Sequence, residues 1–172
     1  MEIGNSDVVT KENLVSQPYA NIYNLLNNRN NVQDPLDSSG IRKFIYSRSP
    51  DENSNNFAGY PYIIISRGSP KRDDGEDSCD ETKGDLIWEF EVMIRSSDKT
   101  RVSPGNGAYS CEQITNNILK TINNVSNRTT LRNYATDIMG ISVDDFDTIE
   151  LSNDVVFYSI ITIRVKRRFL LS

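Results

Sequence analysis

One long alternating stretch, residues 154–171, constrains the fold of this chain more than any other part of the sequence. Its apolar residues share one parity: Val155, Phe157, Ile161, Ile163, Val165 and Phe169. Only Ser159 and Arg167 interrupt this set of odd-numbered positions. The residues at the even-numbered positions change from apolar to polar along the stretch. Such alternation, rich in β-branched and aromatic residues, predicts one long strand. At about 3.3 Å per residue the strand spans roughly 50 Å, so it either bends or reaches beyond its own domain.

Other strands are predicted by the same criterion. Residues 85–95 place Trp88 and Phe90 on one face and Glu89 and Glu91 on the other. This pattern indicates a strand that packs a core on one side and meets water or a partner on the other. Shorter strands are expected at residues 41–47, 60–65 and 148–151.

Helices are predicted over residues 11–28, 111–125 and 129–139. Pro18 either begins the first helix or kinks it, and the asparagine-rich stretch after it is expected to end it. Ser110 and Gln113 have the spacing of a capping box for the second helix. Gly140 is expected to stop the third helix, and residues 144–147 to form a turn.

Residues 67–84 are rich in Asp and Glu and nearly free of apolar residues, so we expect a flexible acidic loop there. The predicted order of elements lacks the helices that a βαβ fold needs between most of its strands. We therefore predict a single α+β domain over residues 1–172. Its antiparallel or mixed β-sheet is expected to carry helices on one face and long loops.

The composition excludes several classes of function. The chain of 172 residues contains no histidine. This removes the commonest general base, the commonest zinc ligand and every catalytic triad that uses histidine. The net charge of -5 argues against a protein that coats nucleic acid broadly, although it allows a local basic strip. We predict no enzyme activity, no cofactor and no metal.

The cysteines and the apolar runs point to an intracellular protein. Cys79 and Cys111 have neither metal-site spacing nor a disulfide framework, and we expect a reduced environment. No run of about 18 apolar residues exists, and the first residues lack the pattern of a signal peptide. Neither a membrane span nor secretion is therefore expected.

An acidic group near the end of the sequence offers carboxylate oxygens of the kind that divalent cations prefer. Its members are Asp144, Asp145, Asp147 and Glu150. The group lacks the spacing and the glycine of an EF-hand loop, so we favour a solvated turn.

Asp85 followed by Glu89-x-Glu91 invites comparison with restriction-type nucleases. Those enzymes need an acidic residue and then Glu-x-Lys on a strand, but here Val92 follows Glu91 and no lysine stands at the required position. The alternation already explains both glutamates as outward-facing residues, so we disfavour a nuclease.

The basic end of the last strand is the most informative polar feature. It comprises Arg164, Lys166, Arg167 and Arg168, and apolar residues including Phe169 and Leu170 follow directly. One interpretation is an edge strand whose charges prevent mispairing. The other is a surface that faces DNA or contacts a neighbouring subunit, since an exposed apolar end favours a partner. The sequence leaves both interpretations open.

The size and the predicted order of elements resemble those of the tail-terminator (tail-completion) proteins of tailed phages and archaeal tailed viruses. The first helix at residues 14–26 and the strand entry Tyr60-Pro61-Tyr62-Ile63-Ile64 carry part of this resemblance. The hairpin strand at 86–94, the packing helix at 111–125 and the closing strand at 155–165 carry the rest.

The resemblance implies a structural virion protein without catalytic residues. Such a protein forms a hexameric ring at the end of the tail tube, terminates tube assembly and joins the tail to the head-neck connector. The implied partners are further copies of the chain, the tail tube protein and a neck or head-completion protein, with passing contact to viral DNA. The implied location is the tail or neck of the virion, after assembly in the host cytoplasm. Another neck or head-closure connector protein is the alternative, and a metal-dependent nuclease is a third hypothesis.

Overall fold

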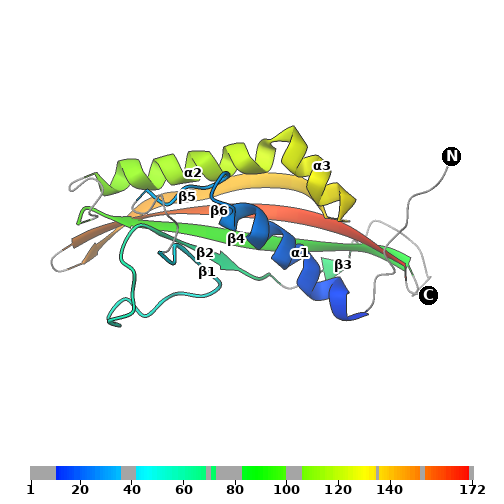
Figure 1. Cartoon of the computed structure of the whole chain (residues 1–172), viewed down its shortest axis with the longest axis horizontal. Helices are drawn as coiled ribbons and strands as arrows, with labels where there is room; N and C mark the ends of the chain where they lie inside the picture. Colours follow the sequence, from blue (N-terminus) through cyan, green and yellow to red (C-terminus); the bar gives the residue numbers. More distant parts are fainter. Residues whose placement is uncertain are drawn as a thin grey trace.

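The computed structural model describes residues 11–35, 42–68, 71–72, 83–99, 106–134, 136–151 and 154–170. In this part of the chain, helices pack on a mixed six-stranded β-sheet (Figure 1). The helices are α1 (Lys11–Asn27), α2 (Gly107–Asn123) and α3 (Val125–Asn133). The strands are β1 (Ile45–Tyr46), β2 (Tyr62–Ser66), β3 (Lys71–Arg72), β4 (Lys83–Ser97), β5 (Asp137–Leu151) and β6 (Asp154–Leu170). The predicted α+β class is confirmed.

The sheet is organised around the pairing of β4 with β6. Its strands follow the order β1-β2-β4-β6-β5, and β3 pairs with β4 beside this path. Only β1 and β2 are parallel, and every other pair is antiparallel. The β4–β6 register runs from Lys83 opposite Leu170 to Ser97 opposite Val156. The predicted long strand is confirmed, and its length is matched by β4 and β5 within the same chain.

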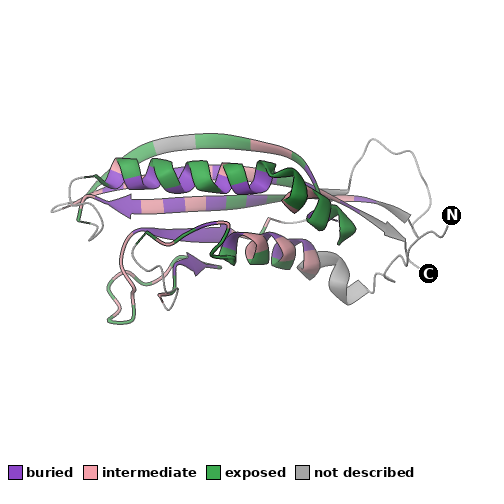
Figure 2. Ribbon diagram, turned by 45° about the horizontal axis from the view of Figure 1, so that its top comes forward, coloured by how far each residue is buried: buried purple, intermediate pink, exposed green. Residues whose placement is uncertain are grey.

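The main hydrophobic core lies on the face of the sheet that the helices cover. The sheet supplies Trp88, Phe90, Ile161, Ile163 and Val165, α1 supplies Tyr19, Ile22 and Leu26, and α2 supplies Cys111, Ile114, Ile118 and Ile122. Figure 2 shows the buried stripe of α2 turned toward the sheet and its exposed stripe turned outward. Complete burial of an apolar side chain stabilises the folded chain by about 1.5–3 kcal/mol. This face therefore provides most of the stabilisation that comes from apolar burial. Burial also raises the pKa of the Cys111 thiol to about 12, while Cys79 lies outside the described residues.

A smaller aromatic cluster lies on the opposite face of the sheet. Tyr46, Tyr62 and Ile64 are buried there, and Phe57, Tyr60 and Met93 pack against them. The connection between β1 and β2 covers this cluster. It turns at Gly59, whose φ of 86° lies in the left-handed region that glycine tolerates best, and it enters β2 through a cis Tyr60–Pro61 bond.

α1 falls close to its predicted bounds of 11–28, whereas α2 and α3 begin and end at other residues than the sequence predicts. Pro18 lies inside α1, which begins upstream of it. α2 begins at Gly107 with Asn106 as its N-cap residue, so the predicted capping box is wrong. Ser110 is instead buried within the helix, which begins about one turn earlier at Gly107, close to the end of β4.

The largest correction concerns residues 134–151. α3 ends at Asn133, and the predicted helix stop Gly140 and the predicted turn at 144–147 both lie in β5. Irregularities between Ile138 and Gly140 and between Val143 and Asp145 interrupt the pairing of β5 with β6. Each extra residue shifts the alternation, so the period-two pattern of the sequence predicts only residues 148–151 of this strand.

Smaller differences concern β1 and the expected acidic loop. β1 comprises only Ile45–Tyr46 of the predicted strand at 41–47. Within the expected loop at 67–84, residues 71–72 form β3 and residues 83–84 begin β4, and both stretches pair within the sheet. Residues 69–70 and 73–82 of this expected loop lie outside the described residues.

Gly107 offers a test of the close packing between α2 and the sheet. A Cβ atom at this position would lie 2.6 Å from the carbonyl carbon of Ser97 and 2.7 Å from Cδ2 of Phe157. We expect Gly107→Ala to lower the free energy of unfolding by about 1–3 kcal/mol, since the helix or the strand must shift. Gly140→Ala is the matched control, because nothing lies within 4 Å of a Cβ there. Urea unfolding of both variants checks this, and equal stabilities would contradict it.

Candidate functional site

The basic end of β6 does not form a uniform positive surface. Arg164 and Lys166 lie on the sheet face opposite the helices, as their parity predicts. Each is paired with an acidic residue of β4. Nε of Arg164 lies 3.2 Å from Oε1 of Glu89, and Lys166 forms an ion pair with the buried carboxylate of Asp85. These pairs neutralise the two cations locally.

Arg167 lies on the helix-covered face, in the interior. Its exposed fraction is 3%, and its guanidinium donates a hydrogen bond of 2.9 Å to Oε1 of Gln17 in α1. Burial lowers the pKa of Arg167. This arginine joins β6 to α1, so we do not include it in a surface that faces DNA or another subunit. Arg167 stands at one of the alternate positions of the strand that otherwise carry apolar residues, and this position in the sequence indicates that its side chain is buried.

The remaining residues expected at this end are described only by their backbone. Arg168, Phe169 and Leu170 pair with Asp85, Gly84 and Lys83 of β4. Their side chains lie outside the described residues. Their role at a DNA-facing or subunit surface therefore stays a prediction.

The acidic residues at 144–150 belong to the outer strand β5 and not to a turn. Asp144 accepts hydrogen bonds from the hydroxyls of Thr162 and Ser142, which lower the pKa of its carboxyl group. Asp147 accepts a bond of 3.3 Å from the hydroxyl of Tyr158. Among the described residues, no group of three or more Asp, Glu, Cys or His side chains is arranged to hold a metal ion.

Exposed apolar side chains occur on β5 and at the two ends of α3, a feature that the sequence did not predict. We call this set the apolar border: Val125, Tyr134, Met139, Val143 and Ile149. Val125 is the most exposed, at 80%. β5 pairs with β6 on one side only, and Figure 2 shows it as a largely exposed strand above α2. The pairing of Val143 with Ile161 and of Ile149 with Val156 places these two side chains on opposite faces of the sheet. Exposed apolar side chains along an outer strand favour a partner that covers the edge.

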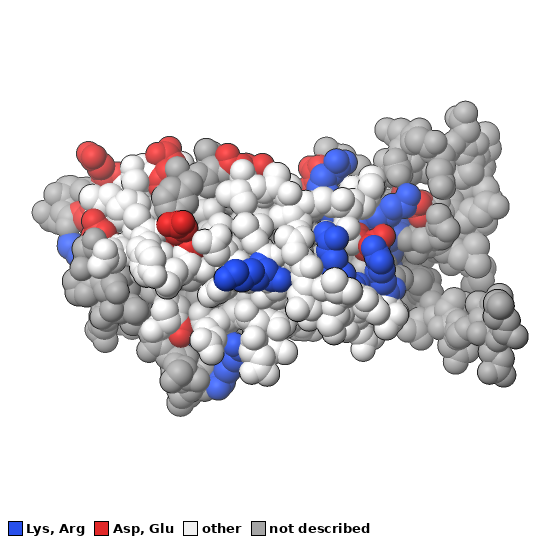
Figure 3. All heavy atoms as spheres, turned by 90° about the horizontal axis from the view of Figure 1, so that it is seen from above, with Lys and Arg blue, Asp and Glu red and all other residues white. Residues whose placement is uncertain are grey.

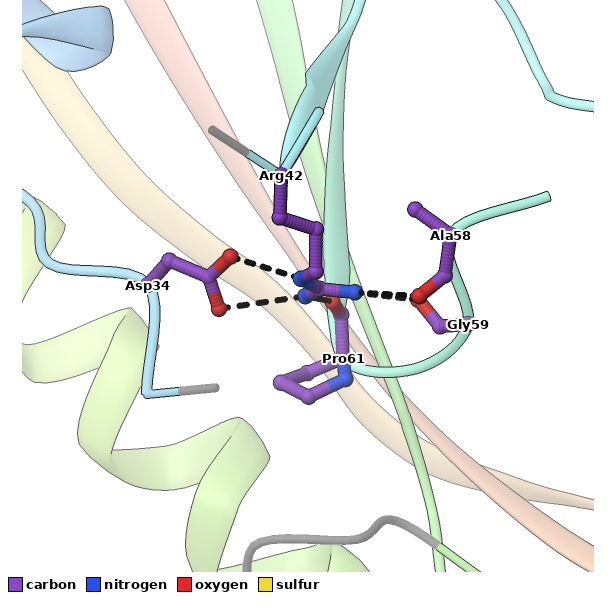
Figure 4. A network of polar contacts seen from close by, with 5 residues as sticks. All are labelled: Asp34, Arg42, Ala58, Gly59 and Pro61. Carbon is purple, nitrogen blue, oxygen red and sulfur yellow. Dashed lines mark hydrogen bonds and ion pairs between the residues drawn. The ribbon is translucent and has the colours of Figure 1, made fainter. Parts of the chain in front are cut away.

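A partly buried polar network fixes the connection between β1 and β2 (Figure 4). Nε and Nη2 of Arg42 lie 2.6 Å and 3.1 Å from the two carboxylate oxygens of Asp34. Nη1 of the same guanidinium donates to the carbonyl oxygens of Ala58 and Gly59 at 3.0 Å and 2.7 Å, and Nη2 also donates to that of Pro61. One side chain thereby fixes three carbonyl groups just before β2.

A second network ties the same connection to the centre of the sheet. Tyr60 and Tyr62 donate their hydroxyls to the carboxylate of Glu52, the former at 2.6 Å. Nη1 of Arg95 in β4 lies 3.2 Å from Oε1 of Glu52. Burial acts to raise the pKa of Glu52, but these hydrogen bonds and the positive charge outweigh it and lower the pKa. Burial and the Glu52 carboxylate raise the pKa values of both tyrosines.

Comparison with known proteins leaves the resemblance untested. No protein-family model matches the chain, and no curated protein shows significant sequence similarity to it. Among the described residues, every helix is too short or too polar to cross a membrane. Membership of the tail-terminator family therefore stays a prediction.

Arg42→Lys tests the first network. Lysine keeps the charge but cannot bind a carboxylate with two parallel N–H groups while reaching three carbonyls. We expect the free energy of unfolding to fall by about 2–3 kcal/mol, and proteolysis of residues 51–61 in the folded protein to become faster. The control is Arg48→Lys, at an exposed position, which should change stability by less than about 0.5 kcal/mol. Equal effects of the two substitutions would contradict the proposed role of Arg42.

Glu52→Gln tests the second network through its pH dependence. The pKa of Glu52 is lower in the folded chain than its ordinary value of 4.5. Its ionised form therefore stabilises the fold above that pH, and this contribution is lost as the pH falls through the folded-state pKa. We expect the stability difference between wild type and Glu52→Gln to be largest near neutral pH and to shrink in acid. Unfolding titrations at several pH values measure it, with the exposed Glu91→Gln as control, and a pH-independent difference would contradict it.

Proposed function

We propose that this chain is a structural virion protein of the tail-terminator type. In this proposal its copies form a ring at the end of the tail tube, terminate tube assembly and join the tail to the head-neck connector. The order of elements supports it: an N-terminal helix, a strand entered through Tyr60-Pro61-Tyr62, long antiparallel strands and a packing helix between them. The partners are other copies of the chain, the tail tube protein and a neck or head-completion protein.

The observation that carries this proposal is the apolar border, three residues of which, Met139, Val143 and Ile149, lie on the 15-residue outer strand β5. An uncovered strand with apolar side chains is a liability for a protein that stays monomeric. In a ring, each subunit covers such a surface with its neighbour. The expected six subunits come from the resemblance, while the apolar border supports self-association in general.

DNA is expected to contact this ring only in passing. Along the basic end of β6, Arg164 and Lys166 are paired with acidic residues and Arg167 is buried. Tight, lasting binding to phosphates requires unpaired positive charge. Paired charges suit a channel wall along which DNA moves without adhering.

Size-exclusion chromatography with light scattering tests the proposal, together with electron microscopy of the same peak. We expect ring-shaped particles with a mass of about six times the chain mass of 19.5 kDa. Rings mixed with the tail tube protein of the same virus should cap the ends of growing tubes and limit their length. Rings that bind the head-neck connector but leave tube growth unchanged would favour a neck or head-closure protein. A chain that stays monomeric at every concentration, alone and with tube protein, would contradict the ring.

A further inference from the structure

The two outer edges of the sheet carry opposite charge. β5 contains Asp137, Asp144, Asp145, Asp147 and Glu150 and no lysine or arginine. We call Asp144, Asp147 and Glu150, all with exposed side chains, the acidic edge. Figure 3 shows acidic side chains gathered along the left part of its upper border, where β5 runs in this view. Asp137 is already paired with Arg132, at 2.8 Å.

The opposite edge, formed by β1 and β2, is basic. Its exposed charges are Lys43, Arg48 and Arg67, which we call the basic edge. Residues 42–48 and 62–68 contain no Asp or Glu. Lys43 lies 4.8 Å above the ring of Tyr46, and Arg67 lies 4.3 Å above that of Tyr19. Cation–π contacts of this kind hold the charges in place.

Among the described residues, two acids close in sequence to the basic edge are already paired with other cations. Asp34 is paired with Arg42 and Glu52 with Arg95. Asp51 is the exposed acidic residue on the connection that follows β1. The described part of this edge therefore presents more positive than negative exposed charge, in contrast to the β5 side.

We propose that the acidic edge of one copy docks on the basic edge of a second copy. This inference rests on the proposed function, because it names the contact through which the ring would close. The docking surface on β5 includes Ile149 of the apolar border, which lies on the same face of the strand as Asp147 and which the neighbour would remove from water. Ions screen charges beyond about 8 Å at physiological ionic strength, so the facing edges decide the attraction rather than the net charge of -5.

The two edges are different surfaces at opposite ends of the sheet order, so the contact is heterologous. A heterologous contact leaves one free edge of each kind on a pair of subunits. Repetition must then close into a ring or continue as a helical filament, and it cannot stop at a symmetric dimer. This property suits a ring protein on a tail.

The irregularities of β5 determine how the copies touch. The pairing register of β5 shifts near Met139 and near Asp144, and bulges of this kind disturb strand-to-strand pairing along an edge. The contact is therefore formed by side chains, charged and apolar, and not by one sheet that continues from copy to copy. Charge reversal should disrupt such a contact strongly.

Two charge-reversal variants test the contact on the full chain. The first carries Asp147→Lys and Glu150→Lys, so both edges become basic. The second carries Lys43→Glu and Arg48→Glu, so both edges become acidic. We expect the association constant of each variant alone to be lower than that of wild type by a factor of about ten or more, because like charges then face each other. Sedimentation velocity over a range of protein concentrations measures this, and circular dichroism checks the fold.

Mixing the two variants provides the decisive measurement. Each reversed edge then meets a complementary edge of the other variant, so alternating rings with an even number of subunits should form. A chain that carries all four substitutions should also associate with itself. Matched controls away from both edges are Glu91→Lys on the central strand β4 and Lys120→Glu on α2, both exposed. We expect wild-type association in both controls.

The outcomes separate this contact from the proposed ring. Loss of association in both variants with recovery in the mixture supports the contact. Wild-type rings that the reversals do not weaken overturn the edge contact and leave the ring standing. Loss in each variant without recovery in the mixture also overturns the direct pairing of the two edges. A wild-type chain that stays monomeric at all concentrations overturns both the contact and the ring.

Discussion

The pairing of β4 with β6 is the interaction on which the rest of the structure depends. The two strands lie side by side over the whole length of β4, and each alternates apolar and polar residues. Their shared register places apolar residues side by side in the middle of the pair: Trp88 is opposite Val165, Phe90 opposite Ile163 and Val92 opposite Ile161. The resulting apolar face binds α1 and α2, and the outer sides of the pair receive β2 and β5. A shift of one residue would turn this face toward water.

Much of this framework could be predicted from the sequence, because period-two and helical periodicities are local. β6, β4 and α1 fall close to their predicted bounds. β5 could not be predicted, because two register irregularities break its alternation and its acidic residues have low strand propensity. Its conformation is set by hydrogen bonds to β6, which come from a different part of the chain. The same reason explains why the beginning of this strand was assigned to a helix.

The candidate site was predictable only in part. The parity of β6 separates Arg167, which is buried, from Arg164 and Lys166, which are not. The acidic partners of those two cations lie on a strand distant in sequence, so the neutralisation of the basic end emerges only from the register. The Arg42 network binds mainly carbonyl groups, which every residue carries and no sequence pattern reveals.

The place of β6 in the sheet also determines when this fold can form. β6 is the last of the described elements in chain order, yet it lies between β4 and β5. During synthesis neither of those long strands has its central partner until residues 154–170 have left the ribosome. Contacts between residues so distant in sequence form slowly, and unpaired apolar strands are prone to aggregate meanwhile. The central pairing of the sheet therefore waits for residues 154–170, and a nascent chain that stops before residue 154 lacks the strand that joins β4 to β5.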